Sequence, residues 1–331
     1  MVIVFQSKPS LLAAAAVVGP LEKRSVFHTY FDKVLDDERL NKSTNEEGNA
    51  MLISEACHAI LKKSNLNNLD IDYFLGGDLI NQMTPTNFAA KELAISFIGM
   101  FSACATSVSS IIVAALLTEL GASEFAIAGA SSQHNSVERQ FRYPVDYGAQ
   151  KPATAQWTVT AAGFALVGKH NTQSPVIEAA TVGKVIDYGA TDPFHMGGAM
   201  APAAFDTIQA HLSKRQQKIQ DYDVIMTGDL GKVGLKILKA MFAQSGTSKE
   251  DLARFRDAGA EFFGEDTAFQ AGASGAGCSA SIYCSYMIDQ FKSGRYKKAL
   301  LVATGALLSP LTFQQGETIP CTAHAIEIGM G

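Results

Sequence analysis

The sequence predicts an α/β fold built from two copies of one module, in which buried strands alternate with helices. The first observation is an internal repeat. Residues 71–79 and 222–230 are both short apolar runs containing Gly-Asp-Leu at their ends, at an offset of 151 residues. The second is that each run is followed by a cysteine that opens an uncharged helix, and then by another apolar strand. A motif repeated at a fixed offset indicates a duplicated unit. Apolar strands joined by crossover helices are typical of parallel sheets.

The later elements of the two copies also correspond. Cys104 precedes an uncharged helix and a strand at 125–130, and Cys278 precedes a helix and a strand at 300–305. A helix as free of charge as 105–118 must lie between two sheets, because no side of it suits water. We therefore expect a five-layer α-β-α-β-α sandwich.

The two halves are expected to span residues 1–170 and 171–331, related by a pseudo-twofold axis. The charge-free run at 95–101 is expected to be a buried strand. The other predicted elements are helices at 49–63, 201–212 and 232–242, a strand pair at 155–168 and 176–188, and a polar surface excursion at 249–269.

The composition narrows the class of protein. Only 18% of the residues are charged, against roughly 25% in an average soluble domain. Much of the surface must therefore be hidden, in a thick core or in a subunit interface. The net charge of −5, from 27 basic and 32 acidic residues, argues against nucleic-acid binding. The high apolar content excludes a disordered or fibrous chain.

Two segments have the apolar character of membrane signals, but neither is predicted to act as one. Residues 10–18 resemble the core of a signal peptide, yet only Lys8 precedes them as a nearby cation, and the following Gly-Pro suits the end of a buried strand. Residues 93–118 are long enough to span a bilayer, but they contain many small polar side chains. We expect a buried strand and helix there, with no transmembrane segment and no cleaved signal.

The five cysteines are odd in number and irregularly spaced, with no CxxC pair and no zinc-ligand pattern, which favours free thiols. Cys104 is the strongest candidate for chemistry. A thiol at a strand-to-helix junction feels the helix N-terminus, which lowers its pKa, and backbone N–H groups there can hold an oxyanion. Packing in an Ala/Ser-rich buried segment is the alternative.

The acid–base partners that a catalytic thiol needs are missing from the positions expected to face it. None of the seven histidines follows the second-module strand end, where Thr227 and Asp229 stand instead. The other apex, from Ser274 to Cys278, supplies neither Asn nor His. Its glycines lack the spacing of a P-loop or dinucleotide fingerprint, so no cofactor is expected.

A second candidate region is the polar and aromatic segment at 131–151, which follows a strand end where open α/β sheets bind ligands. Its arginines and tyrosines suit a planar aromatic anion, because a guanidinium grips carboxylates and rings stack. A subunit interface favours the same residue types, so both interpretations stay open. The candidate residues are Arg139, Arg142, Tyr143 and Lys151.

The duplicated module with a cysteine opening the buried helix of its first copy resembles the thiolase fold of condensing enzymes, without their catalytic His and His/Asn. A closer resemblance is to the stage V sporulation protein AD family. It rests on the runs at 134–135, 138–144, 191–194, 199–204, 227–230, 302–310 and 317–320.

This resemblance implies a protein that binds dipicolinic acid (pyridine-2,6-dicarboxylate). It also implies action with the other stage V sporulation A membrane proteins in moving that acid, with calcium, into the forespore. The protein would be peripheral at the forespore or spore inner membrane and a homodimer, with no cofactor besides the ligand or its calcium chelate.

On this hypothesis, Cys104, Thr227, Ser274 and Cys278 line the ligand cavity, and residues of 139–151 contribute to recognition. Asp229 would repel a bare dianion unless calcium bridges the two or the carboxyl is protonated. The alternative function is an acyltransferase that uses Cys104 as its nucleophile.

Overall fold

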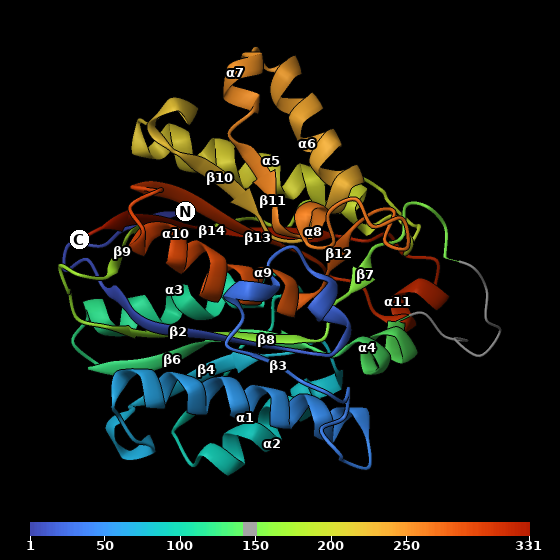
Figure 1. Ribbon diagram of the computed structural model, residues 1–331. Coiled ribbons are helices and arrows are strands. Elements are labelled where there is room, and N and C mark those ends of the chain that lie inside the picture. The colour runs from blue at the N-terminus through green and yellow to red at the C-terminus, as the bar shows by residue number, and fades with distance from the viewer. Residues whose placement is uncertain (142–150) are drawn as a thin grey trace.

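The computed structural model describes residues 1–141 and 151–331, which form the five-layer α-β-α-β-α stack that the duplication predicts (Figure 1). One outer layer is α1 (Asn45–Ser64) with α2 (Thr84–Leu93), and the other is α5 (Met196–Arg215) with α6 (Gly231–Gln244). Between the sheets lie α3 (Thr106–Glu119), α9 (Ala276–Ile282) and α10 (Ile288–Lys292), the last two joined by a π-helical turn. The middle helices pack on apolar side chains of both sheets, which explains why α9 has no charged residue and α3 has none before Glu119.

Each half contributes five strands in the same order. In the first half the order is β2-β8-β6-β4-β5, and in the second it is β9-β14-β13-β10-β11. In both, the first two pairings are antiparallel and the last two are parallel. The first set is β2 (Ser10–Val18), β8 (Ala161–Gly168), β6 (Phe125–Ser132), β4 (Tyr73–Gly77) and β5 (Phe97–Gly99). The second is β9 (Pro175–Val182), β14 (Cys321–Met330), β13 (Lys298–Ala306), β10 (Val224–Thr227) and β11 (Phe255–Asp257).

Short strands complete the topology. The two sets join where Ser10 of β2 pairs with Val176 of β9. The strand β1 (Val2–Val4) pairs with β9, and β3 (Lys33–Val34) pairs with β2. Separately, β7 (Trp157–Thr158) pairs with β12 (Ala273–Ser274) beside the middle layer.

The duplication is visible in the helices as well. Helices α1 and α5 are both 20 residues long, and each ends at a residue in the left-handed conformation, Asn65 or Gln216. Each is followed by a 3₁₀ turn and then by a central parallel strand. The second half departs from the first at 249–269, which carries α7 (Lys249–Leu252), β11 and α8 (Ala258–Glu261).

Three sequence predictions about elements are wrong. The segment 249–269 is not a surface excursion, because it supplies β11, and Phe255 and Phe262 are buried. Residues 155–168 and 176–188 do not form a strand pair: β8 pairs with β2 and β6, whereas β9 pairs mainly with β14. Finally, β5 is a half-exposed edge strand rather than a buried one, since it pairs with β4 alone.

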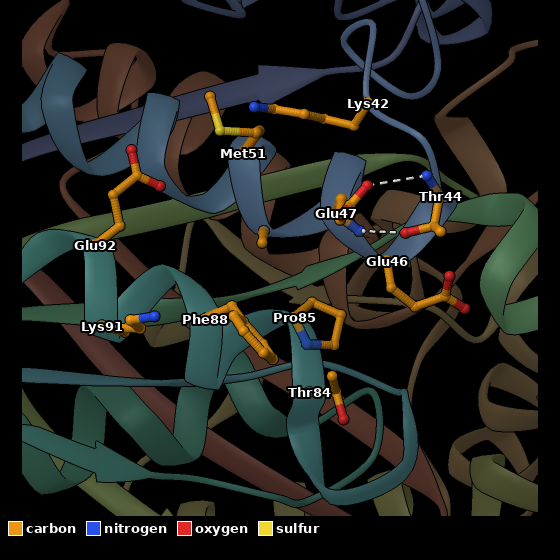
Figure 2. Close-up of a pocket in the computed structure, with 11 residues that line it drawn as sticks. Lys42, Thr44, Glu46, Glu47, Met51, Thr84, Pro85, Phe88, Lys91 and Glu92 are labelled. Carbon is orange, nitrogen blue, oxygen red and sulfur yellow. Dashed lines mark hydrogen bonds between the residues drawn. The ribbon is translucent and has the colours of Figure 1, made fainter.

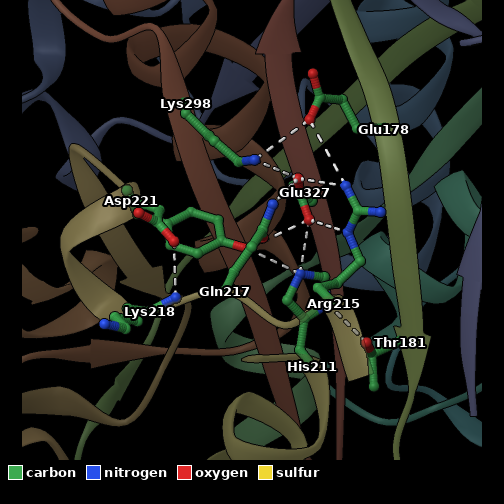
Figure 3. Close-up of polar contacts among 10 residues, drawn as sticks. Glu178, Thr181, His211, Arg215, Gln217, Lys218, Asp221, Lys298 and Glu327 are labelled. Atoms are coloured by element: carbon green, nitrogen blue, oxygen red, sulfur yellow. Dashed lines mark hydrogen bonds and ion pairs between the residues drawn. The ribbon is translucent and has the colours of Figure 1, made fainter. Parts of the chain in front are cut away.

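A buried charged cluster fixes the C-terminal end of α5 to the second sheet (Figure 3). Glu327 of β14 is completely buried and accepts hydrogen bonds from His211 and Arg215 of α5 at 2.9 Å each. Lys298 of β13 lies 2.7 Å from the other carboxylate oxygen. Burial alone would raise the pKa of Glu327, but these donors hold it well below its usual range. Removing one partner of such a buried pair costs far more stability than the pair adds.

Candidate functional site

Cys104 lies in a tight turn between the edge strand β5 and the N-terminus of α3. Ala103 adopts a left-handed conformation with φ of 50°, which the Thr106 hydroxyl stabilises. That hydroxyl donates to the Ala103 carbonyl at 2.6 Å and accepts from the Ser102 N–H at 2.9 Å. The turn presents the thiol to a small cavity while leaving Cys104 only 9% exposed.

The cavity beside Cys104 is small and mostly apolar. Its volume is about 40 Å³, room for no more than a few water molecules. It opens toward a wider hollow of about 380 Å³ that shares four of its wall residues, Leu79, Phe101, Phe141 and Leu308. The remaining walls of the inner cavity are Ala103, Val137, Thr158, Met196, Ser274, Gly275 and Ala306.

A buried carboxyl group lies behind the thiol. Asp229 is completely buried, and its Oδ1 accepts from the Thr304 N–H at 3.2 Å and the Thr304 hydroxyl at 2.5 Å. Its Oδ2 has no hydrogen-bond partner of normal geometry in the described part of the chain, and Cys104 is the thiol that faces this carboxyl. Burial raises the pKa of Asp229 to about 7, and the nearby Asp257 carboxyl contributes.

This environment keeps the thiol protonated. Burial raises the pKa of Cys104 well above its usual range, and the Asp229 carboxyl raises it further. The lowering expected from the N-terminus of α3 is therefore wrong for this site, because desolvation and a neighbouring acid outweigh the helix. None of the residues that line the cavity is a histidine. The described cavity thus has a thiol that faces a buried carboxyl group, and no histidine to activate the thiol.

The structure brings together some of the predicted site residues and separates others. Ser274 lines the cavity with Cys104, and Asp229 lies directly behind the thiol. The hydroxyl of Thr227 instead donates to Asp257 at 2.7 Å, away from the cavity wall. The thiol of Cys278 is completely buried and donates to the Gly228 carbonyl at 3.3 Å.

The predicted recognition segment begins at the rim of the wider hollow. In α4 (His134–Phe141), Arg139 points to α1 and pairs with Glu46. Lys151 lies 3.2 Å from the Glu138 carboxylate and 4.5 Å from the centre of the Trp157 ring. Arg142 and Tyr143 lie outside the described residues. The neighbours Gln140 and Phe141 line the hollow.

Sequence reasoning missed the apolar walls. Phe101, Met196 and Leu308 come from three distant segments, and nothing in their spacing marks them as neighbours. It also missed Thr304, the partner of Asp229. Thr304 is the only polar residue at positions 299–305, and a lone polar residue in an apolar strand could have indicated its role.

A larger hollow of about 500 Å³ lies elsewhere, on the outer layer between α1 and α2 (Figure 2). Its walls combine exposed Phe88 with cations at Lys42 and Lys91 and acids that include Glu47. Glu47 is engaged in the N-terminal cap of α1, where its side chain and Thr44 exchange hydrogen bonds. This mixture of charges indicates no ligand class, and the hollow shares no wall residue with the Cys104 cavity.

Comparison with known proteins decides the family. The family model of stage V sporulation protein AD (SpoVAD) matches residues 1–329. The chain belongs to the stage V sporulation protein AD family. A curated member, the stage V sporulation protein AD of Bacillus subtilis (strain 168), is 42% identical over 329 residues, covering 98% of this chain and 95% of that protein.

Solved structures show the fold that this family member has. OleA of Xanthomonas campestris is similar with a TM-score of 0.61 at 14% identity, covering 99% of both chains. The 3-oxoacyl-[acyl-carrier-protein] synthase III of Aquifex aeolicus is similar with a TM-score of 0.57 at 12% identity, covering 97% of this chain and 99% of that one. The fold is therefore thiolase-like, as the sequence predicts. Across 1–141 and 151–331, no helix combines the length and the apolar character needed to cross a bilayer.

Proposed function

We propose that this protein binds dipicolinic acid in the hollow at Cys104, as the peripheral component of a membrane complex that moves the acid into the forespore. The observation that carries the proposal is the site at Cys104, where a protonated thiol faces a buried carboxyl group and no histidine lines the cavity. A preformed cavity of this kind holds a small ligand without turning it over. Membership of the stage V sporulation protein AD family supports a role in spore formation.

The size of the hollow fits a small ring better than the inner cavity does. Ligand pockets commonly measure about 300–1,000 Å³, and the outer hollow has about 380 Å³. The pyridine ring is placed there, against Phe101 and Phe141, with one carboxyl group pointing into the inner cavity. Cys104 and the Ser274 hydroxyl offer donors to that carboxyl group.

The unusual pKa of Asp229 removes the expected repulsion. A carboxyl whose pKa is about 7 is largely neutral in mildly acidic solution and half neutral near pH 7. In that form it does not repel a dianion. In its ionised form a calcium ion is needed between the two, so the acid binds either free or as its calcium chelate.

The competing function is acyl transfer by Cys104. It is favoured by the fold, since the similar solved structures include a 3-oxoacyl-[acyl-carrier-protein] synthase III. Incubation with radiolabelled acyl-coenzyme A separates the two functions. A stable label that disappears in Cys104→Ala supports the enzyme, and saturable dipicolinate binding without any thioester supports the carrier.

Isothermal titration calorimetry with dipicolinate tests the proposal, with and without calcium chloride. We expect one site per chain, weakened by Cys104→Ala and by Ser274→Ala. The matched control is Cys278→Ala, which alters a buried thiol off the cavity wall. No saturable binding by the folded wild-type protein would overturn the proposal.

The same proposal includes a homodimer. The edge strand β5 pairs with β4 alone among the described strands, and Phe101, which follows it, is 54% exposed. An open edge flanked by an exposed ring is a natural pairing surface. Light scattering of the wild type and of Phe101→Asp, which places a charge beside this edge, tests this, with a dimer expected only for the wild type.

A further inference from the structure

A cluster of buried polar side chains, which we call the polar chamber, lies beneath the N-terminus of α1, on the sheet face opposite the Cys104 cavity. Its floor is the end of the first sheet, where Ser131 of β6 and Gly19, after β2, lie on the face that α1 covers. Asn49, Ile53, Ala56 and Ile60 recur at the spacing of one helical face, and all four are completely buried. Asn49 therefore lies on the helix face that packs against the end of the sheet, where Ser131 lies.

Two carboxylates enter this chamber from different segments. Glu22 is completely buried, and its Oε1 accepts from the Thr160 N–H at 2.9 Å. The Thr160 hydroxyl in turn donates to Glu38 Oε2 at 2.9 Å. The second oxygen of Glu22 points over Gly19, where an added Cβ would lie 2.7 Å from it. Thr160 thus donates hydrogen bonds to both Glu22 and Glu38, so the two carboxylates lie close together.

The chamber contains several polar atoms without hydrogen-bond partners. Among the described residues, Glu22 Oε2, both side-chain polar atoms of Asn49 and the Ser131 hydroxyl are buried and unpartnered. The nearest amide, Gln133 Nε2, reaches Glu38 Oε2 and Asn45 Oδ1 only at 3.4 Å each. Native proteins leave few buried polar atoms unpaired, so such a concentration indicates a missing ligand.

A hard cation would contact these oxygens together, because carboxylate, amide and hydroxyl oxygens can all coordinate it.

We propose that this chamber binds a hard divalent cation of the calcium type through Glu22, Glu38 and Asn49. Carboxylates with amide and hydroxyl oxygens are the donors that calcium prefers, and its coordination is flexible enough for an irregular set completed by water. No group of three or more His, Cys, Asp or Glu side chains that could hold a metal occurs in the described ranges, so the two carboxylates would need amide, hydroxyl and water oxygens to complete the coordination. Access is through Glu38 and Asn45, which are only half-buried.

The ion would join four parts of the first half: the turn after β2, the loop before α1, α1 itself and the end of β6. That end carries α4, whose first N–H donates to the Thr160 hydroxyl at 3.0 Å. The site is thus a structural support behind the hollow and does not depend on dipicolinate.

Calcium chloride titrated calorimetrically into chelator-treated full-length protein, without dipicolinate, tests the proposal. We expect one calcium per chain with a dissociation constant on the order of 10⁻⁵–10⁻⁴ M, and a rise in the melting temperature. Glu22→Gln and Glu38→Gln should each weaken binding at least tenfold. Glu55→Gln, which alters a half-buried acid on α1 that pairs with Lys33 outside the chamber, is the matched control and should not.

Absence of calcium binding by the folded wild type, or full binding in both glutamine variants, would overturn the proposal. If those variants fail to fold, manganese soaked into wild-type crystals decides: an anomalous peak beside Glu22 supports the site, and ordered waters alone refute it. Because dipicolinate is left out, failure here leaves the proposed ligand function standing.

Discussion

The two Gly-Asp-Leu turns end equivalent strands, β4 and β10, yet their aspartates have different partners. In the first half, Asp78 is fully occupied. One oxygen accepts from the Ile80 N–H at 2.7 Å, and the other accepts from the Thr86 N–H at 2.9 Å and the Thr86 hydroxyl. Asp78 therefore fixes the turn and the start of α2.

In the second half that task falls to another residue. Asp257, at the end of β11, accepts from the N–H groups of Leu230, Gly231 and Ala260 at 2.7 to 2.9 Å. It also accepts from the Thr227 hydroxyl. Asp229 is thereby released from the turn and keeps one oxygen free to face Cys104.

The comparison teaches how a duplicated structural residue can become a site residue. Asp257 ends β11, which takes the place of β5 in the first half, and so replaces the support that Asp78 gives in the first copy. We infer that in the second half Asp257 supports the turn and Asp229 is left to face the cavity.

The largest expected effect on stability comes from removing Asp257, the residue that supports the turn in the second half. Asp257→Ala leaves the buried N–H groups of Leu230, Gly231 and Ala260 without an acceptor, and should lower the free energy of unfolding by about 3–5 kcal/mol. Asp78→Ala, which strands two N–H groups and one hydroxyl, should cost about 2–4 kcal/mol. Urea unfolding followed by circular dichroism measures both. A cost under about 1 kcal/mol for Asp257→Ala would refute the assigned division of roles.

Asp229→Asn should raise the free energy of unfolding, whereas the two preceding substitutions lower it. The pKa of Asp229 is raised to about 7 in the folded state, so its ionisation opposes folding. That cost is absent below about pH 4 and is fully present above about pH 7. The isosteric amide removes it and should stabilise the protein by about 1–3 kcal/mol at pH 8, with little change at pH 4.

The same variant tests the ligand hypothesis. Without calcium, the affinity of the wild type for dipicolinate should fall about tenfold between pH 6 and pH 8, because the carboxyl ionises. In Asp229→Asn the affinity should vary little over this range. Calorimetry at three pH values measures this. If the affinity of both proteins falls equally with pH, Asp229 is not part of the binding site.

Much of this arrangement could be predicted from the sequence, since the repeat at residues 71–79 and 222–230 already indicates two equivalent strand ends. The absence of a histidine at Thr227–Asp229 likewise predicts an incomplete catalytic site. What the sequence could not predict is the exchange of Asp229 for Asp257. That exchange depends on β11 pairing beside β10, a long-range contact within a segment whose polarity is typical of a surface loop.

The two cysteines extend the comparison. Burial raises the pKa of both thiols well above the usual range, so both should react with iodoacetamide at pH 8 at least tenfold more slowly than free cysteine. Only Cys104 borders the cavity, so it should react before Cys278 and be protected by dipicolinate. Mass spectrometry of timed samples measures this, and equal rates would contradict the assigned cavity.

The smallest expected effect on stability is that of Arg139→Ala. Arg139 is mostly exposed and pairs with Glu46 across the N-terminus of α1; an exposed ion pair contributes about 0–1 kcal/mol. The segment 139–151 is nevertheless our candidate for recognising the ligand carboxylates, so affinity should fall while stability stays. The matched control is Glu46→Gln, which breaks the same ion pair but keeps the guanidinium. If both variants bind dipicolinate equally well and a dimer dissociates instead, the segment is a subunit interface and Arg139 has no part in recognition.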